Sequence, residues 1–161
     1  MSVAAVPPFQ TFLDEHRDVV WRFLLAAAGP DDAEDCFQET FIAALRAYPR
    51  LRTQRREHNL RAWVLTIAER KALDAHRARG RRALPVAEPD AGRAAAAPER
   101  RDEQLWEAVH RLPARQRSAV VLRFLADLPH REIASAIGCS EQAARRSLHE
   151  GLANLRKAVA T

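Results

Sequence analysis

The sequence has only two cysteines and five glycines among its 161 residues, and it has no apolar run long enough to span a membrane. Its N-terminus also lacks the basic start and the apolar core of a secretory signal peptide. These absences exclude a disulfide-stabilised secreted scaffold and a membrane-inserted protein. They predict a cytoplasmic protein.

Patterns that carry catalysis or bind metals are missing too. The sequence has no Ser-His-Asp order, no glycine-rich phosphate loop and no cluster with metal-ligand spacing, so it predicts neither an enzyme nor a cofactor. Cys36 and Cys139 lie far apart, and neither has His or Cys neighbours at the spacing of a zinc site. We interpret both cysteines as small, buried apolar residues.

The composition that remains is typical of helices, because apolar residues make up 47% of the chain and many of them are alanine. The predicted fold class is all-α, with two small helical domains joined by a flexible linker. The domains are expected at residues 1–82 and 102–161. Between them, in residues 83–101, prolines and an alanine run replace the amphipathic pattern. The net charge of +5 suits a polyanionic partner.

Two long helices are predicted at the start of the first domain. Apolar residues recur at helical spacing from Phe9 to Ala28, and the Gly-Pro pair that follows ends that helix. The second helix is expected from Asp31 to Tyr48. Its predicted inner face is aromatic and aliphatic: Phe37, Phe41, Ala44, Leu45 and Tyr48.

The second helix carries carboxylates at positions 31, 32, 34, 35 and 39, with no basic residue among them. Carboxylates near a helix N-terminus are stabilising, which explains the first three or four of them. It does not explain an outer stripe that combines acidic, amide and apolar side chains: Asp35, Gln38, Glu39 and Ile42. We interpret this stripe as a candidate docking surface for a basic helix of a partner protein.

A basic segment follows. Pro49 to His58 is predicted to be a loop, and Asn59 is a plausible N-cap for a third helix that extends to about Arg79. Part of the positive charge near the end of this helix complements the helix dipole. The number of cations nevertheless favours a phosphate-binding surface: Arg70, Lys71, Arg77, Arg79, Arg81 and Arg82, against Asp74. Trp63 is either core filler or a platform on which an unpaired base stacks.

Four helices are predicted from Asp102 onward, with Trp106 packed in their core. The last two meet at Gly138-Cys139-Ser140 and are predicted to form a helix-turn-helix. Gly138 can adopt the positive φ that ends a helix, and Ser140 is a good N-cap for the next one. The apolar stripe of the final helix is regular: Ala144, Leu148, Leu152, Leu155 and Val159.

The opposite face of the final helix bears groups that hydrogen-bond to base edges: Gln142, Arg145, Arg146, His149 and Glu150. Arginine pairs well with guanine and glutamine with adenine in the major groove. The pattern therefore favours DNA recognition. The plainer alternative is a solvated basic face on an ordinary helical hairpin.

Three segments resemble conserved regions of the sigma-70 family, in order and at the expected separations. Asp32–Phe41 is similar to the family's second region, Arg61–Asp74 to its −10 reading helix, and Leu112–Glu141 to its fourth region. Because only a short linker separates the two parts, the chain resembles the smallest subgroup, the extracytoplasmic-function (ECF) sigma factors.

The resemblance implies a protein without catalytic activity that binds core RNA polymerase, through the β′ clamp helices and the β flap, and directs it to promoter DNA. It also implies an anti-sigma factor as a further partner, and a linker that threads toward the polymerase active centre. The acidic stripe would dock on the clamp helices. The implied −10 contacts, which capture a flipped base, are Arg55, Arg56, His58, Trp63, Arg70, Lys71, Asp74 and Arg77. The implied −35 contacts are Arg131, Gln142, Arg145, Arg146, His149 and Glu150.

The sequence departs from the family pattern at a few positions. Glu150 stands where many members have a basic residue, and it either accepts from a cytosine amino group or orients Arg146. Arg70 stands where relatives often carry asparagine, which leaves the identity of the −10 base open. Pro129 replaces a common serine N-cap, and proline suits a first helical turn.

An alternative hypothesis is that the protein is a stand-alone helix-turn-helix regulator, which binds duplex DNA without polymerase. It would use the same final helix. The acidic stripe and the helix that carries Trp63 would then have no assigned purpose, so the sequence favours the sigma factor.

Overall fold

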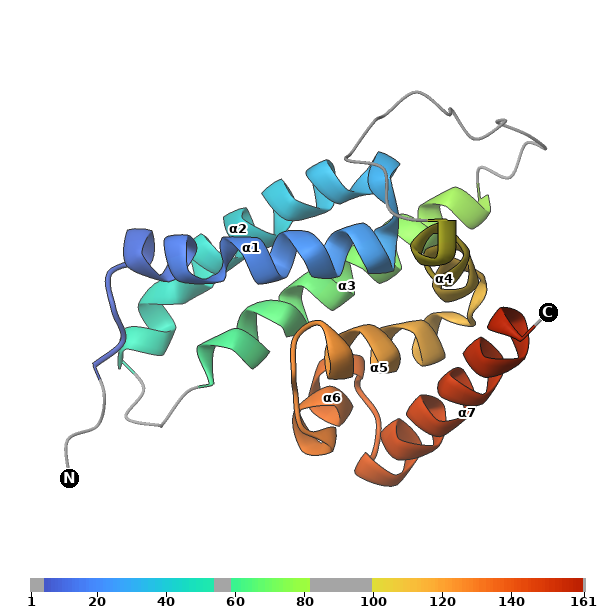
Figure 1. Ribbon diagram of the computed structural model, residues 1–161. Helices are drawn as coiled ribbons and strands as arrows, with labels where there is room; N and C mark the ends of the chain where they lie inside the picture. Colours follow the sequence, from blue (N-terminus) through green and yellow to red (C-terminus); the bar gives the residue numbers. More distant parts are fainter. Residues whose placement is uncertain (1–4, 54–58, 82–99, 161) are drawn as a thin grey trace.

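The computed structural model describes residues 5–53, 59–81 and 100–160, with side chains from Glu103 onward in the last range. Seven α-helices and no strand occur in these ranges, which confirms the all-α prediction. The helices form two groups, here called the N-terminal bundle (α1–α3) and the C-terminal bundle (α4–α7). Figure 1 shows α1, α2 and α3 side by side, with α5, α6 and α7 below them.

The N-terminal bundle consists of three long helices that contact one another pairwise: α1 (Phe9–Ala28), α2 (Pro30–Thr53) and α3 (Leu60–Arg81). The chain turns from α1 into α2 at Gly29, whose φ of 85° is a conformation that glycine adopts at low cost. Phe12 is fully buried at the centre of an aromatic cluster. Its ring centroid lies 5.2 Å from that of Tyr48 and 5.7 Å from that of Trp63.

Helix α2 is longer than predicted, because it continues through Pro49 to Thr53. The prediction of a loop from residue 49 was wrong for 49–53, and the rest of that loop lies outside the described residues. Proline in a helix interior removes one backbone hydrogen bond. Two tertiary contacts hold the last turns in place: the Tyr48 hydroxyl donates to the Pro7 carbonyl, and Leu51 is buried. Packing therefore overrides the local preference of proline. The predicted Asn59 cap is confirmed, since its Oδ1 accepts from the Ala62 N–H at 3.1 Å.

The C-terminal bundle has four helices: α4 (Arg100–Arg111), α5 (Ala114–Phe124), α6 (His130–Ile137) and α7 (Glu141–Val159). Most of the predicted linker precedes α4 and lies outside the described residues. Several residues predicted to be core are at the surface. Leu45, Leu105 and Val159 are 54%, 41% and 55% exposed, and Trp106 is 37% exposed. They lie on the edges of their apolar stripes, where the described helices leave them partly uncovered.

The turn of the helix-turn-helix is built as the sequence predicted. Gly138 has φ 70° and ψ 43°, in the left-handed region, and the Cys139 N–H donates to the Ala134 carbonyl at 3.0 Å. The Ser140 hydroxyl then accepts from the Ala143 N–H at 3.1 Å and caps α7. These contacts fix the angle at which α7 leaves α6.

Helix α7 packs closely on α5 at Gly151. A Cβ atom at this position would lie 2.9 Å from Cγ2 of Val120 and 3.3 Å from the Gln116 carbonyl oxygen. Only a glycine fits there without displacing a neighbour, so the contact fixes the distance between the two helices.

Gly151→Ala is expected to destabilise the chain by about 1–3 kcal/mol, because the methyl group overpacks the α5–α7 contact. The gain in helix propensity, about 1 kcal/mol, offsets only part of this. Gly80→Ala is the matched control, because nothing lies within 4 Å of the added Cβ in α3. Urea unfolding of both variants measures the difference. Equal stability of the two variants would contradict the close approach.

The two bundles contact each other, which the sequence did not predict. Helix α3 packs against α5 and α6, and α1 packs against α4 and α5. The interface places the start of the helix-turn-helix beside the third helix of the N-terminal bundle.

Candidate functional site

Helix α7 presents the predicted recognition face to solvent. Gln142, Arg145, Arg146, His149 and Glu150 are all exposed, while Ala144, Leu148 and Leu155 on the other side are buried. Arg131, on α6, is exposed as well. The burial pattern agrees with the apolar stripe inferred from the sequence, apart from Val159.

Two side chains of this face hydrogen-bond to other described residues. Arg145 Nη2 donates to Glu141 Oε1 at 2.9 Å, one helical turn away, and this bond lowers the pKa of the Glu141 carboxyl. Glu150 Oε2 accepts from Gln116 Nε2 of α5 at 3.4 Å. Among the described residues no ion pair joins Glu150 to Arg146, and the two roles considered for Glu150 stay predictions.

The acidic stripe lies on the outer surface of α2. Asp35, Gln38 and Glu39 are exposed and Ile42 is 50% exposed. On the opposite side of the helix Cys36 and Thr40 are buried, and the Thr40 hydroxyl donates to the Cys36 carbonyl at 2.6 Å. The stripe is therefore available to a partner and is not part of the chain's own core.

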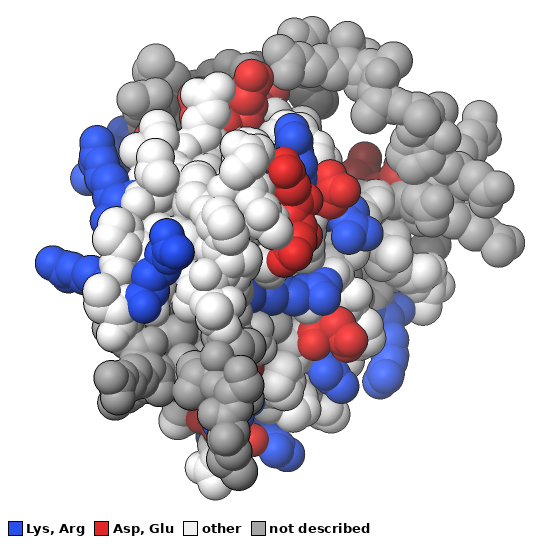
Figure 2. Space-filling model, turned by 90° about the vertical axis from the view of Figure 1, so that its left-hand side faces the viewer, with Lys and Arg blue, Asp and Glu red and all other residues white. Residues whose placement is uncertain are grey.

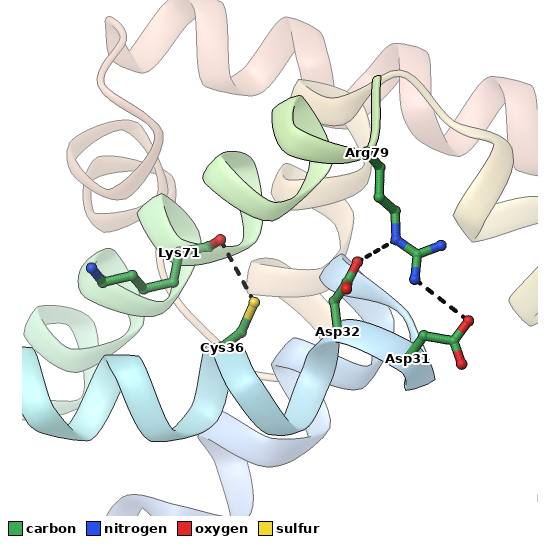
Figure 3. A network of polar contacts seen from close by, with 5 residues as sticks. All are labelled: Asp31, Asp32, Cys36, Lys71 and Arg79. Atoms are coloured by element: carbon green, nitrogen blue, oxygen red, sulfur yellow. Dashed lines mark hydrogen bonds and ion pairs between the residues drawn. The ribbon is translucent and has the colours of Figure 1, made fainter. Parts of the chain in front are cut away.

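The first carboxylates of α2 have a separate, structural role. Arg79 of α3 pairs with Asp32 through Nε and with Asp31 through Nη2, the latter at 3.4 Å, as Figure 3 shows. These contacts tie the end of α3 to the start of α2. Arg79 is thus engaged within the protein, which removes one cation from the predicted phosphate-binding surface.

Cys36 lies beside this contact and donates to the Lys71 carbonyl at 3.6 Å (Figure 3). Burial and the nearby carboxylates raise the pKa of its thiol to about 11. The thiol is therefore protonated at neutral pH, which suits a core residue and not a nucleophile. Cys139 is only half-buried, so the expectation of a buried residue holds for Cys36 alone. No group of three His, Cys, Asp or Glu side chains in the described ranges could hold a metal ion.

The outer face of α3 carries the predicted −10 residues. Arg70, Asp74 and Arg77 are exposed, and Lys71 is half-buried. Trp63 is half-buried, with its ring centroid 6.3 Å from that of Tyr48. The tryptophan thus contributes to the aromatic core and leaves part of its surface uncovered. Arg55, Arg56 and His58 lie outside the described residues.

The described residues on one face of the molecule carry charge of both signs. Figure 2 shows acidic side chains gathered near the centre right of one face, with basic side chains among them and at the left edge. The described residues therefore do not form a uniformly basic surface on this face. No helix within 5–53, 59–81 and 100–160 is long and apolar enough to cross a membrane.

Sequence reasoning missed a buried polar cluster between the bundles. Ser118 Oγ of α5 donates to Glu69 Oε1 of α3 at 2.6 Å, and both side chains are buried. Burial raises the pKa of the Glu69 carboxyl to about 7, against the lowering effects of the Ser118 bond and the charge of Arg117. The signal was present in the sequence, because Glu69 follows Leu65 at the spacing of the apolar face of α3.

Arg117 is the other charged member of this cluster. It is 7% exposed, and its Nη1 donates to the His110 carbonyl at 3.0 Å. Burial lowers the pKa of the Arg117 guanidinium and that of the His110 imidazole. Burying an ionised group between two packed bundles costs free energy of folding unless the group is well paired.

Comparison with known families finds two conserved regions in this chain, one in each bundle. The family described as "Sigma-70 region 2" matches residues 12–82, and "Sigma-70, region 4" matches residues 102–155. The ECF RNA polymerase sigma factor SigD of Mycobacterium tuberculosis (strain H37Rv) is 33% identical over 160 residues, covering 91% of this chain and 74% of SigD. ECF sigma factor SigE of Mycolicibacterium smegmatis is 31% identical over 167 residues, covering 98% of this chain and 63% of SigE.

Solved structures share the fold. The sigma factor RpoE of Bartonella quintana, in complex with the anti-sigma factor NepR, superimposes with a TM-score of 0.75 at 20% identity, over 95% of this chain and 97% of RpoE. CnrH in complex with the cytosolic domain of CnrY gives a TM-score of 0.68 at 22% identity, over 92% of this chain and 85% of CnrH.

Proposed function

This chain belongs to the sigma-70 family, in its ECF group of proteins that bind core RNA polymerase and direct it to promoters, and from that premise we propose which surface meets each partner. We consider three surfaces as binding surfaces for these partners: the acidic stripe of α2, the outer face of α3 and the recognition face of α7. The observation that carries the proposal is that each surface is open to solvent, in part or fully, while other faces of the same helices are buried in the core, at Cys36 and Thr40 of α2, Val64 and Ala68 of α3, and Ala144 and Leu148 of α7.

The acidic stripe (Asp35, Gln38, Glu39 and Ile42) docks on the β′ clamp helices of polymerase. It offers two carboxylates around an exposed isoleucine, which suits a basic helix with an apolar centre. The C-terminal bundle supplies a second polymerase surface, an apolar groove of about 350 Å³ between α4, α5 and α7. Leu105, Trp106 and Phe124 line this groove, and we assign it to the β flap.

The outer face of α3 binds the −10 element as a single strand. Arg70 and Arg77 neutralise phosphates, with Lys71 beside them, and the uncovered part of Trp63 stacks on a flipped base. Asp74 accepts from a base amino group. The basic residues Arg55, Arg56 and His58, from the segment before α3, complete the surface in this proposal.

Helix α7 enters the major groove at the −35 element. Arg145 and Arg146 read guanine edges, Gln142 reads adenine, and His149 with Arg131 contacts the backbone or a neighbouring base. Glu150 accepts from cytosine only if it leaves Gln116. Glu141 keeps Arg145 extended along the helix before DNA binds.

Arg145→Ala and Arg146→Ala are each expected to weaken binding to the cognate −35 element by about 1–3 kcal/mol, the discrimination that one bidentate arginine–guanine pair provides. The loss should be confined to promoters with guanine at the contacted position. Arg111→Ala on α4 is the control, because that side chain is exposed and far from the recognition face in sequence. Transcription in vitro from a set of single-base −35 variants measures the effect. An equal loss on every variant would show that these arginines contact phosphates.

The proposal extends to regulation and place of action. An anti-sigma factor holds the chain inactive, as suggested by the RpoE structure, in which that sigma factor is bound to NepR. The chain binds and melts promoter DNA, and the polymerase makes the phosphodiester bonds. Because polymerase acts on the chromosome, the chain acts in the cytoplasm.

Titration with purified core polymerase, followed by sequencing of the transcripts made in vitro, tests this function. We expect a stoichiometric complex and transcripts that start downstream of one shared promoter sequence. A chain that binds promoter duplex tightly by itself and forms no complex with polymerase would contradict the proposal and favour a stand-alone regulator.

A further inference from the structure

The two arginines of the recognition face have different surroundings. Arg145 follows Glu141 by one helical turn, and the two side chains pair at 2.9 Å. Arg146 precedes Glu150 by one turn, yet no ion pair joins them among the described residues. Opposite charges four positions apart on a helix attract each other, and more strongly when the acid comes first. The order of the charges therefore weakens an Arg146–Glu150 pair but does not by itself explain why the pair is missing.

Glu150 is held instead by a side chain of α5. Gln116 Nε2 donates to Glu150 Oε2 at 3.4 Å, and Gln116 Oε1 accepts from Asn154 Nδ2 at 2.8 Å. A carboxylate only accepts hydrogen bonds, so the nitrogen of the Gln116 amide has to face Glu150 and its oxygen is left for Asn154. Both ends of this amide are thus used, in one orientation.

The stem of Gln116 is fixed as well. A Cβ atom at Gly151 would lie 3.3 Å from Cβ of Gln116, so the backbone of α7 lies directly against this residue. Gln116 is half-buried, whereas Glu150 and Asn154 are exposed. The packing of α5 on α7 therefore sets the position from which the amide reaches the two α7 side chains.

The side of α7 on which Gln116 lies decides where the carboxylate goes. Residues four positions apart on an α-helix are rotated by about 40° around the helix axis. Glu150 thus lies about 40° from Arg146 of the recognition face, and about 40° from Asn154 in the other direction. The hydrogen bond to Gln116 draws the carboxylate toward Asn154 and α5, and away from Arg146.

We propose that Gln116 is a positioning residue for −35 recognition: it holds the carboxylate of Glu150 on α5 and so keeps Arg146 available to guanine. The inference rests on the proposed function, because it takes α7 as the helix that reads the −35 element. Without this hold Glu150 pairs with Arg146, and the guanidinium has to give up that pair before it reaches a base edge. Gln116 thus acts on base recognition from outside the recognition helix.

Gln116→Met removes both hydrogen bonds of the amide and keeps an unbranched stem that packs on α7. The affinity of the holoenzyme for a promoter with guanine at the base contacted by Arg146 should fall about threefold. An exposed ion pair at this spacing accounts for about a factor of two, and the guanidinium also loses its aim at the base. With another base at that position the affinity should not change. The Arg146→Ala experiment described above identifies the position.

Rescue distinguishes a positioning role from a structural one. Glu150→Ala in the Gln116→Met chain should restore the wild-type affinity, because that carboxylate no longer competes for Arg146. A residue that only supported the α5–α7 packing would not be rescued in this way. Glu150→Ala alone should match the wild type. Gln116→Glu keeps an acceptor for Asn154 but repels Glu150, so it should lose affinity as Gln116→Met does and recover with the same Glu150→Ala.

Two further chains control for the loss of a hydrogen bond as such. Asn154→Ala removes the shorter bond to Gln116 and leaves the bond between Gln116 and Glu150 in place. Gln10→Met makes the same substitution on α1, where Gln10 Nε2 donates to Asp14 Oδ1 at 3.1 Å. Both chains should bind the promoter as the wild type does. Circular dichroism checks that each chain retains its helices.

Two measurements decide the inference. Fluorescence anisotropy gives the affinity of each holoenzyme for the promoter duplexes. Nuclear magnetic resonance of the free chains follows the Nε–H signal of Arg146, which shifts when the guanidinium pairs with a carboxylate. We expect this signal to shift in Gln116→Met and to return when Glu150→Ala is added.

The outcomes separate this inference from the proposed function. An unchanged affinity or an unchanged Arg146 signal in Gln116→Met overturns the inference, and so does a loss that Glu150→Ala does not restore. A loss of affinity in Glu150→Ala alone would show that this carboxylate contacts the DNA, which also overturns it. If no chain, the wild type included, forms a promoter-specific holoenzyme, the proposed function fails. The signal of Arg146 in the free chains then still decides whether Gln116 holds Glu150 away from it.

Discussion

Reversing two charges of the acidic stripe, with Asp35→Lys and Glu39→Lys in one chain, is expected to lower the affinity for core polymerase about 100-fold, or about 2.7 kcal/mol. Both side chains are exposed, so the change should not disturb the core. In the complex each new lysine would face a basic partner helix, and like charges across an interface cost several kcal/mol. Fluorescence titration of labelled polymerase measures the loss.

The control for this change carries the same number of reversed charges elsewhere. Glu15→Lys with Asp18→Lys places them on exposed positions of α1. This chain should bind polymerase within about threefold of the wild type at 0.15 M salt, where distant charges are largely screened. If both double variants lose affinity equally, only the net charge matters and the assignment of the stripe as docking surface is wrong.

The stability of the wild-type chain is expected to fall by about 2–4 kcal/mol between pH 4.5 and pH 8 through Glu69 alone. Burial raises the pKa of this carboxyl to about 7 in the folded chain, from an ordinary value of 4.5. Below pH 4.5 the carboxyl is protonated in both states, and its stabilising contribution is complete. As the pH rises, the unfolded chain loses its proton first, so unfolding becomes more favourable until the folded carboxyl has ionised as well.

Glu69→Gln removes this dependence, because the amide does not titrate. Urea unfolding from pH 5 to pH 8 should show a falling free energy of unfolding for the wild type, with the Glu69→Gln chain losing about 2–4 kcal/mol less. Subtracting the free energy of unfolding of one chain from that of the other at each pH removes the contribution of every other titrating group. Parallel curves would mean that Glu69 is well hydrated in the folded protein.

Local features of the fold were predictable because short-range chemistry decides them. Glycine at 138 and serine at 140 specify the end of one helix and the start of the next, and the structure shows both. The apolar spacing of α7 likewise predicted which of its faces is buried, up to Leu155. These features depend on backbone conformation and on periodicity within one helix.

Features that depend on distant residues were not predictable in the same way. Pro49 remains helical because Tyr48 and Leu51 are held by the remainder of the bundle. Trp106 is 37% exposed although it continues an apolar stripe, because the described helices leave part of that edge uncovered. The Glu69–Ser118 contact joins residues 49 positions apart, and no sequence period connects them. The position of Arg79 on Asp31 and Asp32 has the same origin.

The central claim is that one chain holds polymerase with α2 and contacts a promoter at two separate places with α3 and α7. Footprinting of the assembled holoenzyme on a promoter identified by transcription tests it most directly. We expect two protected segments about 25 base pairs apart, with the downstream one reactive as single-stranded DNA, and with Arg146→Ala weakening only the upstream one. Protection of a single segment, or of duplex DNA alone, would contradict the account.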